Sequence, residues 1–174
     1  LRVRGAPAIG VCAAYGIAKT ASQIEADNYA DFEKEFLELK EYFASSRPTA
    51  VNLFWALNRM EDALKANKEK SIDEIKEALF KEAEDIRNED VEISRGIGAL
   101  GFKLLKKLKR NGKEIGIMTH CNAGTLATAK YGTATAPMYM ALENGFNGDD
   151  MHVYCDETRP LLQGARLTAF ELSN

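Results

Sequence analysis

Apolar residues recur at helical spacing through about the first 111 of the 174 residues, and the pattern then changes. The clearest case is Tyr29, Phe32, Phe36, Leu39 and Phe43, which follow one another by 3 or 4 positions and so share one helix face. From about residue 113 short apolar runs alternate with loops. The chain is therefore predicted to pass from a helical region into an α/β arrangement.

The helical region carries recognisable start signals. A small-residue segment from Pro7 to about Gln23 predicts a buried helix whose neighbours approach closely. Pro48 is expected in the first turn of another helix, where no N–H is needed. Ser71, with Glu74 three residues on, forms a capping box that starts a long helical segment. Three glycines interrupt that segment: Gly96, Gly98 and Gly101. They favour tight packing against a neighbour, with contact to a ligand as the alternative.

The remaining residues predict strands alternating with helices. Asn111 and Gly112 indicate a turn, and the runs 114–119 and 151–155 are predicted strands. Helices are expected over three segments: 125–134, 137–144 and 161–172.

This order is the start of a parallel sheet. The predicted fold class is α/β, with a mainly helical N-terminal region at 1–111. The first part of a Rossmann-like domain follows at 112–174, incomplete in this chain.

Composition limits the classes of function. With 23 basic and 26 acidic residues the net charge is −3, which argues against a broad nucleic-acid-binding face. No apolar run approaches the ~18 residues of a membrane-spanning helix. Three widely spaced cysteines without a CxxC pair indicate neither a disulfide framework nor a zinc site, and they fit a reducing, cytoplasmic compartment.

Candidate chemistry lies in the loops after the two strands, because ligands of such sheets bind beyond the carboxyl ends of the strands. Cys121 follows the first strand just before an expected helix, whose N-terminus would favour the thiolate and offer N–H groups to a phosphate. A buried small filler is an equally good interpretation of Cys121. Structural roles are favoured for Cys12 and Cys155. His120 could be a general base, although a backbone hydrogen bond is the favoured interpretation.

Other polar residues could contact an anion. Gln163 falls in the first turn of the last expected helix and could face the same crevice, although an ordinary solvated helix start is favoured. Arg2 and Arg4 precede a glycine turn and a helix, and Arg47 stands at another helix start, where guanidinium groups can hold an anion. Each arginine taken alone is more often a surface residue.

Four motifs, taken in order, carry a resemblance: RGAPAIG at 4–10, RPTAVNL at 47–53, THCNAG at 119–124 and ETRPLLQGARLT at 157–168. Together they resemble the family of S-methyl-5-thioribose-1-phosphate isomerases. That family is related to ribose-1,5-bisphosphate isomerases and to regulatory subunits of the exchange factor for translation initiation factor two.

The resemblance implies an aldose–ketose isomerase that converts 5-methylthioribose 1-phosphate to 5-methylthioribulose 1-phosphate in methionine salvage. It implies no cofactor and no metal, and a cytoplasmic homodimer without nucleic-acid or membrane partners. Cys121 carries over as a catalytic residue. Five positions carry over as substrate contacts: Arg4, Gly5, Ala6, Arg47 and Gln163.

The chain departs from this family in length. The family's second catalytic residue, an aspartate on a later strand, and a following Asn-Lys pair have no counterpart among the 174 residues. We therefore expect the chain to be an interior piece of a longer enzyme and inactive by itself. The alternatives are an isomerase of ribose 1,5-bisphosphate or another pentose 1-phosphate, and a non-catalytic regulatory subunit, which would need no reactive thiol at Cys121.

Overall fold

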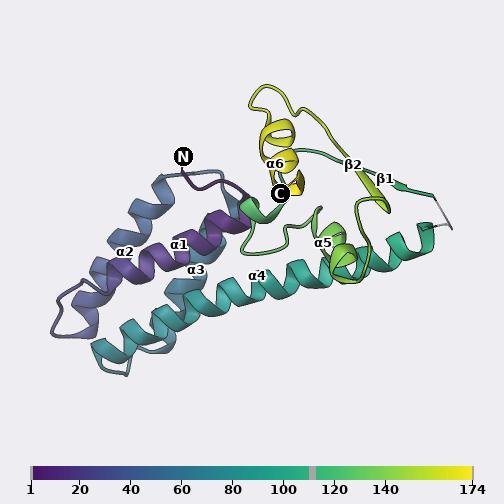
Figure 1. Cartoon of the computed structure of the whole chain (residues 1–174). Coiled ribbons are helices and arrows are strands. Elements are labelled where there is room, and N and C mark those ends of the chain that lie inside the picture. The colour runs from purple at the N-terminus through teal and green to yellow at the C-terminus, as the bar shows by residue number, and fades with distance from the viewer. Residues whose placement is uncertain (1, 110–112, 174) are drawn as a thin grey trace. The chain divides into compact units, whose positions relative to one another are not determined.

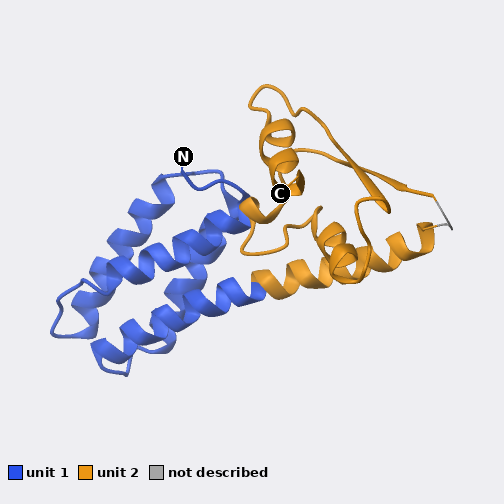
Figure 2. Cartoon of the chain, in the orientation of Figure 1, with its two compact units in different colours: residues 1–89 blue, residues 90–174 orange. Residues whose placement is uncertain are grey.

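The computed structural model describes residues 2–109 and 113–173, and the chain forms two compact units, residues 1–89 and 90–174 (Figure 2). The boundary between the units falls within α4 (Ile72–Leu108), the longest helix. The domain boundary predicted between residues 111 and 112 lies outside the described residues and stays a prediction.

The first unit is built from helices α1 (Ala6–Ala21), α2 (Tyr29–Ser45), α3 (Val51–Ala66) and the N-terminal part of α4 (Figure 1). Its core is made of large apolar side chains that are fully buried: Phe32, Phe36, Ile17, Leu57, Met60, Leu64, Ile75, Leu79 and Ile86. Phe32 and Phe36 confirm the buried face predicted from the spacing of apolar residues in α2.

The start signals behave as predicted at Ser71 and differently at Pro48. The Ser71 N–H donates to the Glu74 carboxylate at 2.9 Å, and the Glu74 N–H donates to Ser71 Oγ at 3.4 Å, which confirms the capping box. Pro48 lies outside the helix that it was expected to start, because residues 47–50 form a turn closed by the Ala50 N–H and the Arg47 carbonyl at 3.1 Å. Proline suits the second position of such a turn.

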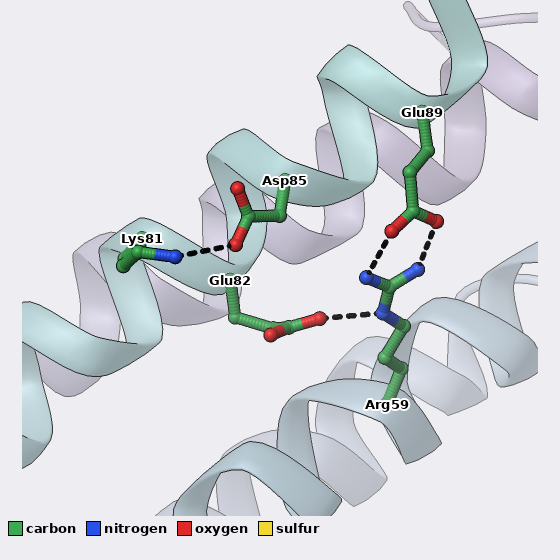
Figure 3. A network of polar contacts seen from close by, with 5 residues as sticks. All are labelled: Arg59, Lys81, Glu82, Asp85 and Glu89. Carbon is green, nitrogen blue, oxygen red and sulfur yellow. Dashed lines mark hydrogen bonds and ion pairs between the residues drawn. The ribbon is translucent and has the colours of Figure 1, made fainter. Parts of the chain in front are cut away.

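Ion pairs join α3 to α4 within the first unit (Figure 3). The Arg59 guanidinium donates to both carboxylate oxygens of Glu89, with Nη2 to Oε1 at 2.7 Å, and its Nε donates to Glu82. Such bidentate pairs fix the geometry of the two side chains. The hydrogen bonds that Arg59 donates to Glu89, and then the Arg59 charge, hold the pKa of the Glu89 carboxyl below its ordinary value.

The second unit contains a two-stranded parallel sheet, β1 (Ile115–Thr119) and β2 (Met151–Cys155), in the register Ile115 to Met151 and Thr119 to Cys155. This confirms the predicted strands and their parallel start. The helix expected near 137–144 is α5 (Ala136–Glu143). A small core joins the end of α4 to this sheet and helix: Leu105, Ile115 and Ala141. The turn predicted at residues 111–112 lies outside the described residues.

The helix expected over 125–134 is wrong. Only residues Thr125–Ala127 are helical, as the 3-10 turn η1. The Thr128 hydroxyl instead donates to the Lys130 carbonyl at 3.2 Å and accepts from the Gly132 N–H at 3.0 Å. A threonine side chain that takes local backbone partners in this way competes with the helical hydrogen bonds.

The segment 161–172 holds a helix of mixed type, the π-helix η2 (Gln163–Thr168) followed by α6 (Ala169–Ser173).

The glycines of α4 do not interrupt α4. A Cβ at Gly98 would lie 2.9 Å from the Ala136 carbonyl oxygen, and one at Gly101 would lie 2.4 Å from Pro137 Cγ. These two glycines therefore let α5 approach α4 closely, which confirms the prediction of tight packing at Gly98 and Gly101. At Gly96 the prediction is wrong, because a Cβ there would meet nothing within 4 Å.

Candidate active site

The loops after β1 and β2 lie side by side at the carboxyl edge of the sheet. Their strands end in register, and the Asp156 N–H donates to the Thr119 carbonyl at 3.1 Å. This brings residues 120–125 and 156–168 together, as predicted from the sequence.

Cys121 is half-buried and has a left-handed backbone, with φ of 64°. Its N–H donates to Thr158 Oγ1 at 3.0 Å, and its carbonyl accepts from Thr168 Oγ1 at 2.7 Å. A non-glycine residue with positive φ persists where its surroundings over-determine it, and such residues cluster at functional sites. Cys121 is thus placed by side chains of the neighbouring segment, whereas an ordinary filler would be held by packing alone.

His120 pairs with a carboxylate, and the favoured prediction of a backbone partner is wrong. Its Nδ1 lies 2.9 Å from Asp156 Oδ2, and its side chain is 70% exposed. Because an ionised carboxylate only accepts hydrogen bonds, Nδ1 carries the proton of this contact. The pair ties the ends of the two strands together beside Cys121.

The helix predicted after Cys121 is reduced to the 3-10 turn η1, and the Glu171 carboxylate takes the N–H groups at its start that were expected to be open to a phosphate. Its carboxylate accepts from the N–H groups of Thr125, at 2.6 Å, and Leu126, at 3.1 Å, and from Asn122 Nδ2, at 2.9 Å. A Cβ at Gly124 would lie 2.0 Å from Glu171 Oε2, so a larger residue there would displace the carboxylate from these N–H groups. Nothing in the sequence pattern singled out Glu171, because its partners are 45–49 residues away along the chain.

Gln163 is half-buried and is the first residue of η2, directly after Leu162, whose φ is 60°. It shares this helix with Thr168, the residue that bonds the Cys121 carbonyl. The following Gly164 lies against the chain, since a Cβ there would be 1.8 Å from the Asp156 carbonyl oxygen. The structure therefore places Gln163 and Cys121 on adjoining segments of the second unit.

The remaining predicted contacts belong to the first unit. Gly5 precedes α1 with φ of 96°, a conformation that favours glycine, and its carbonyl accepts from the Ile9 N–H at 3.0 Å. Ala6 is the first residue of α1 and Arg4 is exposed. Arg47 is half-buried in the turn before α3.

A cavity of about 180 Å³ lies between Arg47 and the start of the chain, within the first unit. It is lined by Arg2, Val3, Ile9, Cys12, Ala13, Phe43, Ser46, Arg47 and Leu53. Among the residues that the structure describes, the guanidinium groups of Arg2, Arg4 and Arg47 have no carboxylate partner, in contrast to Arg59. Positive charge beside an apolar lining is thus left without a counterion in this unit.

The other two cysteines differ from Cys121. Cys12 is exposed on the cavity wall, outside the core of its helix. Burial, and then the Asp156 charge, raises the pKa of the Cys155 thiol, which disfavours its thiolate.

Residues 2–109 and 113–173 hold no candidate membrane span and no candidate metal cluster. No helix there has the length and apolar content needed to cross a membrane. No cluster of three or more His, Cys, Asp or Glu side chains is arranged to hold a metal ion.

The chain belongs to the Initiation factor 2 subunit family, whose profile matches residues 2–174. It is 54% identical to the 5-deoxyribose 1-phosphate isomerase of Petrotoga mobilis and 56% identical to the methylthioribose-1-phosphate isomerase of Symbiobacterium thermophilum. Each alignment covers 99% of this chain, but only 47% and 45% of the relative. The chain thus spans about half the length of the curated relatives it matches.

Two solved structures share the fold. The 5-methylthioribose 1-phosphate isomerase of Pyrococcus horikoshii matches with a TM-score of 0.86 over 99% of this chain and 46% of its own. The translation initiation factor eIF-2B subunit delta of A. fulgidus matches with a TM-score of 0.84 over 99% of this chain and 48% of its own. Both are 41% identical to this chain, so the fold is the α/β fold of the family and does not separate the enzyme from the initiation factor.

Proposed function

We propose that this chain contributes to the active site of a sugar-1-phosphate isomerase of the aldose–ketose type. The observation that carries the proposal is its 54–56% identity, over nearly all of its length, to relatives named as such isomerases. The substrate proposed first is 5-methylthioribose 1-phosphate, with 5-methylthioribulose 1-phosphate as the product, in methionine salvage.

The chemistry assigns Cys121 the central role. A phosphate on C1 prevents free opening of the sugar ring, so the enzyme must assist ring opening and then move a hydrogen between C2 and C1. A thiol on the half-buried Cys121, two residues past β1 and with its backbone fixed by hydrogen bonds, is a suitable acid or base for that transfer. The hydrogen moves either as a proton through an enediolate-type species or as a hydride.

The substrate contacts proposed are Arg4, Gly5, Ala6, Arg47 and Gln163. The unpaired guanidinium groups of the first unit suit a phosphate, and the Gln163 amide suits a sugar hydroxyl. The apolar cavity beside Arg47 supports a substrate that is anionic at one end and apolar at the other. The names of the relatives describe two such sugars, with a methylthio group or hydrogen at C5.

The cavity lining also bears on the alternative substrate. Ribose 1,5-bisphosphate carries a second phosphate at C5, and an anion set against Val3, Ile9 and Leu53 would lose its hydration without full compensation. This disfavours the bisphosphate. Besides Arg47, Arg2 is the one lining residue whose positive charge could compensate for the hydration that the anion loses.

A regulatory, non-catalytic subunit is the second candidate, because the A. fulgidus initiation factor subunit has the same fold at the same identity. The arrangement of Cys121 favours the enzyme, since a binding module needs no thiol held in a left-handed conformation.

We further propose a cytoplasmic homodimer. Light scattering of the natural full-length protein would test the dimer.

The deciding experiment is an assay of the natural full-length protein with 5-methylthioribose 1-phosphate, 5-deoxyribose 1-phosphate and ribose 1,5-bisphosphate. Turnover is expected with the first two. Cys121→Ser should lower kcat by about 10²–10⁴-fold, the usual contribution of an acid–base group. Cys155→Ser is the matched control and should leave kcat unchanged, because Cys155 lies outside the proposed substrate contacts and its thiolate is disfavoured by burial. Absence of turnover with all three sugars would favour the regulatory subunit.

A further inference from the structure

The backbone of Cys121 is held on both sides by two threonine hydroxyls. Thr158 Oγ1 accepts from the Cys121 N–H at 3.0 Å, and Thr168 Oγ1 donates to the Cys121 carbonyl at 2.7 Å. The two threonines come from the segment after β2, 37 and 47 residues further along the chain. The peptide units before and after the thiol-bearing carbon are thus both bound to another element.

Each hydroxyl both donates and accepts a hydrogen bond in this arrangement. Thr158 Oγ1 also donates to the Asp156 carbonyl at 3.2 Å, and Thr168 Oγ1 also accepts from Asn122 Nδ2 at 3.2 Å. Each threonine therefore donates one hydrogen bond and accepts one, which a valine of the same shape cannot do. Thr168 is fully buried, so its polar group would have no water to replace a lost partner.

These hydrogen bonds hold Cys121 in an unfavourable backbone conformation. A cysteine with φ of 64° is in a region that side chains with a Cβ seldom occupy, and it relaxes to negative φ unless its neighbours prevent this. Relaxation would rotate the Cα–Cβ bond and carry the sulfur to a different place. Thr158 itself has φ of 59°, so its hydroxyl is aimed by a loop that is also constrained.

We propose that Thr158 and Thr168 are positioning residues that hold the Cys121 thiol in its reactive place. This inference rests on the proposed function of Cys121 in the isomerase reaction. Neither threonine needs to touch the substrate, because both act on the cysteine peptide units.

The test compares Thr158→Val and Thr168→Val with Thr158→Ser and Thr168→Ser in the natural full-length protein. Each valine variant should lower kcat by about 10²-fold, the cost of misplacing a reacting group by roughly 1 Å. KM should change by less than about twofold, because the contacts that bind the sugar phosphate are elsewhere. The serine variants, which keep the hydroxyl group, should restore most of the activity.

Thr20→Val is the matched control, since Thr20 Oγ1 donates only to the Gly16 carbonyl within α1, at 2.9 Å. It removes a threonine hydroxyl and should leave kcat unchanged. Should Thr168→Val fail to fold because Thr168 is buried, the half-buried Thr158 decides the question. Valine variants with the kcat of the wild type, or serine variants as slow as the valine variants, would overturn the proposal.

A second readout is independent of isomerase activity. The alkylation rates of Cys121 and of the exposed Cys12 by iodoacetamide are measured in the same sample by peptide mass spectrometry. In the valine variants the ratio of the Cys121 rate to the Cys12 rate should rise about threefold or more, because the half-buried thiol becomes accessible. If the wild type isomerises none of the sugars, the proposed function fails, but this ratio still shows whether the threonines hold the cysteine.

Discussion

The two units of this chain are stabilised in different ways. The first unit has regular helices around large buried side chains such as Phe36 and Leu57, with ion pairs on the outside. The second unit has a smaller apolar cluster around Leu105, Ile115 and Ala141, and many of its contacts are hydrogen bonds between side chains and loop backbone. Cys121, the candidate catalytic residue, lies in a loop of the second unit that is held by such hydrogen bonds.

The difference shows why loops held by side chains suit a reactive site. The stability of a helical core is the sum of many small van der Waals contacts, so it does not depend on the exact placement of any one group. A loop held by a few directed hydrogen bonds can keep one residue in an unfavourable conformation, as at Cys121, but loses it when one donor or acceptor is removed.

The largest expected effect on stability tests the core of the first unit. Phe36→Ala removes a fully buried ring and should cost about 3–5 kcal/mol of unfolding free energy. The matched change in the second unit, Leu105→Ala, should cost no more than about 2–3 kcal/mol, because Leu105 is 9% exposed in a small cluster. Urea denaturation measures both. Equal losses would show that the two cores contribute alike and would remove this part of the contrast.

The next effect concerns the loop polar network. Glu171→Ala leaves the N–H groups of Thr125 and Leu126 and the Asn122 amide without their acceptor, and should cost about 3 kcal/mol. Glu143→Ala, an exposed position at the end of α5, is the control and should change stability by less than about 0.5 kcal/mol. A loss below about 1 kcal/mol for Glu171→Ala would mean that water replaces the carboxylate.

Two glycines of α4 should respond in opposite directions. Gly98→Ala should destabilise by about 1–3 kcal/mol, since its Cβ would meet the Ala136 carbonyl at 2.9 Å. Gly96→Ala should stabilise by about 0.5–1 kcal/mol, because nothing lies within 4 Å and alanine favours the helix. Thermal unfolding of both variants gives the signs. Stabilisation by both would show that α5 can retreat from α4.

The smallest effect is a pH dependence in the first unit. Hydrogen bonds from Lys40, and then from Lys65, lower the pKa of the Glu61 carboxyl below its ordinary 4.5. The stabilisation is therefore complete well above that pH and is lost as the pH falls through the lowered pKa. Glu61→Gln should cost about 0.5–1 kcal/mol at about pH 7 and almost nothing at about pH 2. A difference that persists in acid would assign the effect to packing.

Much of the fold could be predicted from the sequence because its signals are local. The spacing of Phe32 and Phe36 and the Ser71–Glu74 capping box involve residues three or four positions apart. The apolar runs at β1 and β2 and the parallel start of the sheet were also predicted correctly. The helix expected over 125–134 failed on a competing local contact, the Thr128 hydroxyl with its own loop, which composition alone does not reveal.

The candidate site could be predicted only in outline. The strand-end position of Cys121 and the neighbouring loop with Gln163 follow from the order of elements. The carboxylate partner of His120 and the carboxylate that fills the expected anion site did not, since Asp156 and Glu171 reach these places from 36 or more residues away.

By itself the sequence determined the helices of the first unit, the two strands, their order and the four motifs of the family, because periodicity and motif spacing act over a few residues. Only the tertiary structure decided that Cys121 has a left-handed backbone between Thr158 and Thr168, and that Gly98 lies against α5. The physical reason is that these contacts join segments tens of residues apart. Their partners are chosen by packing and by the need to satisfy polar groups, which no local pattern records.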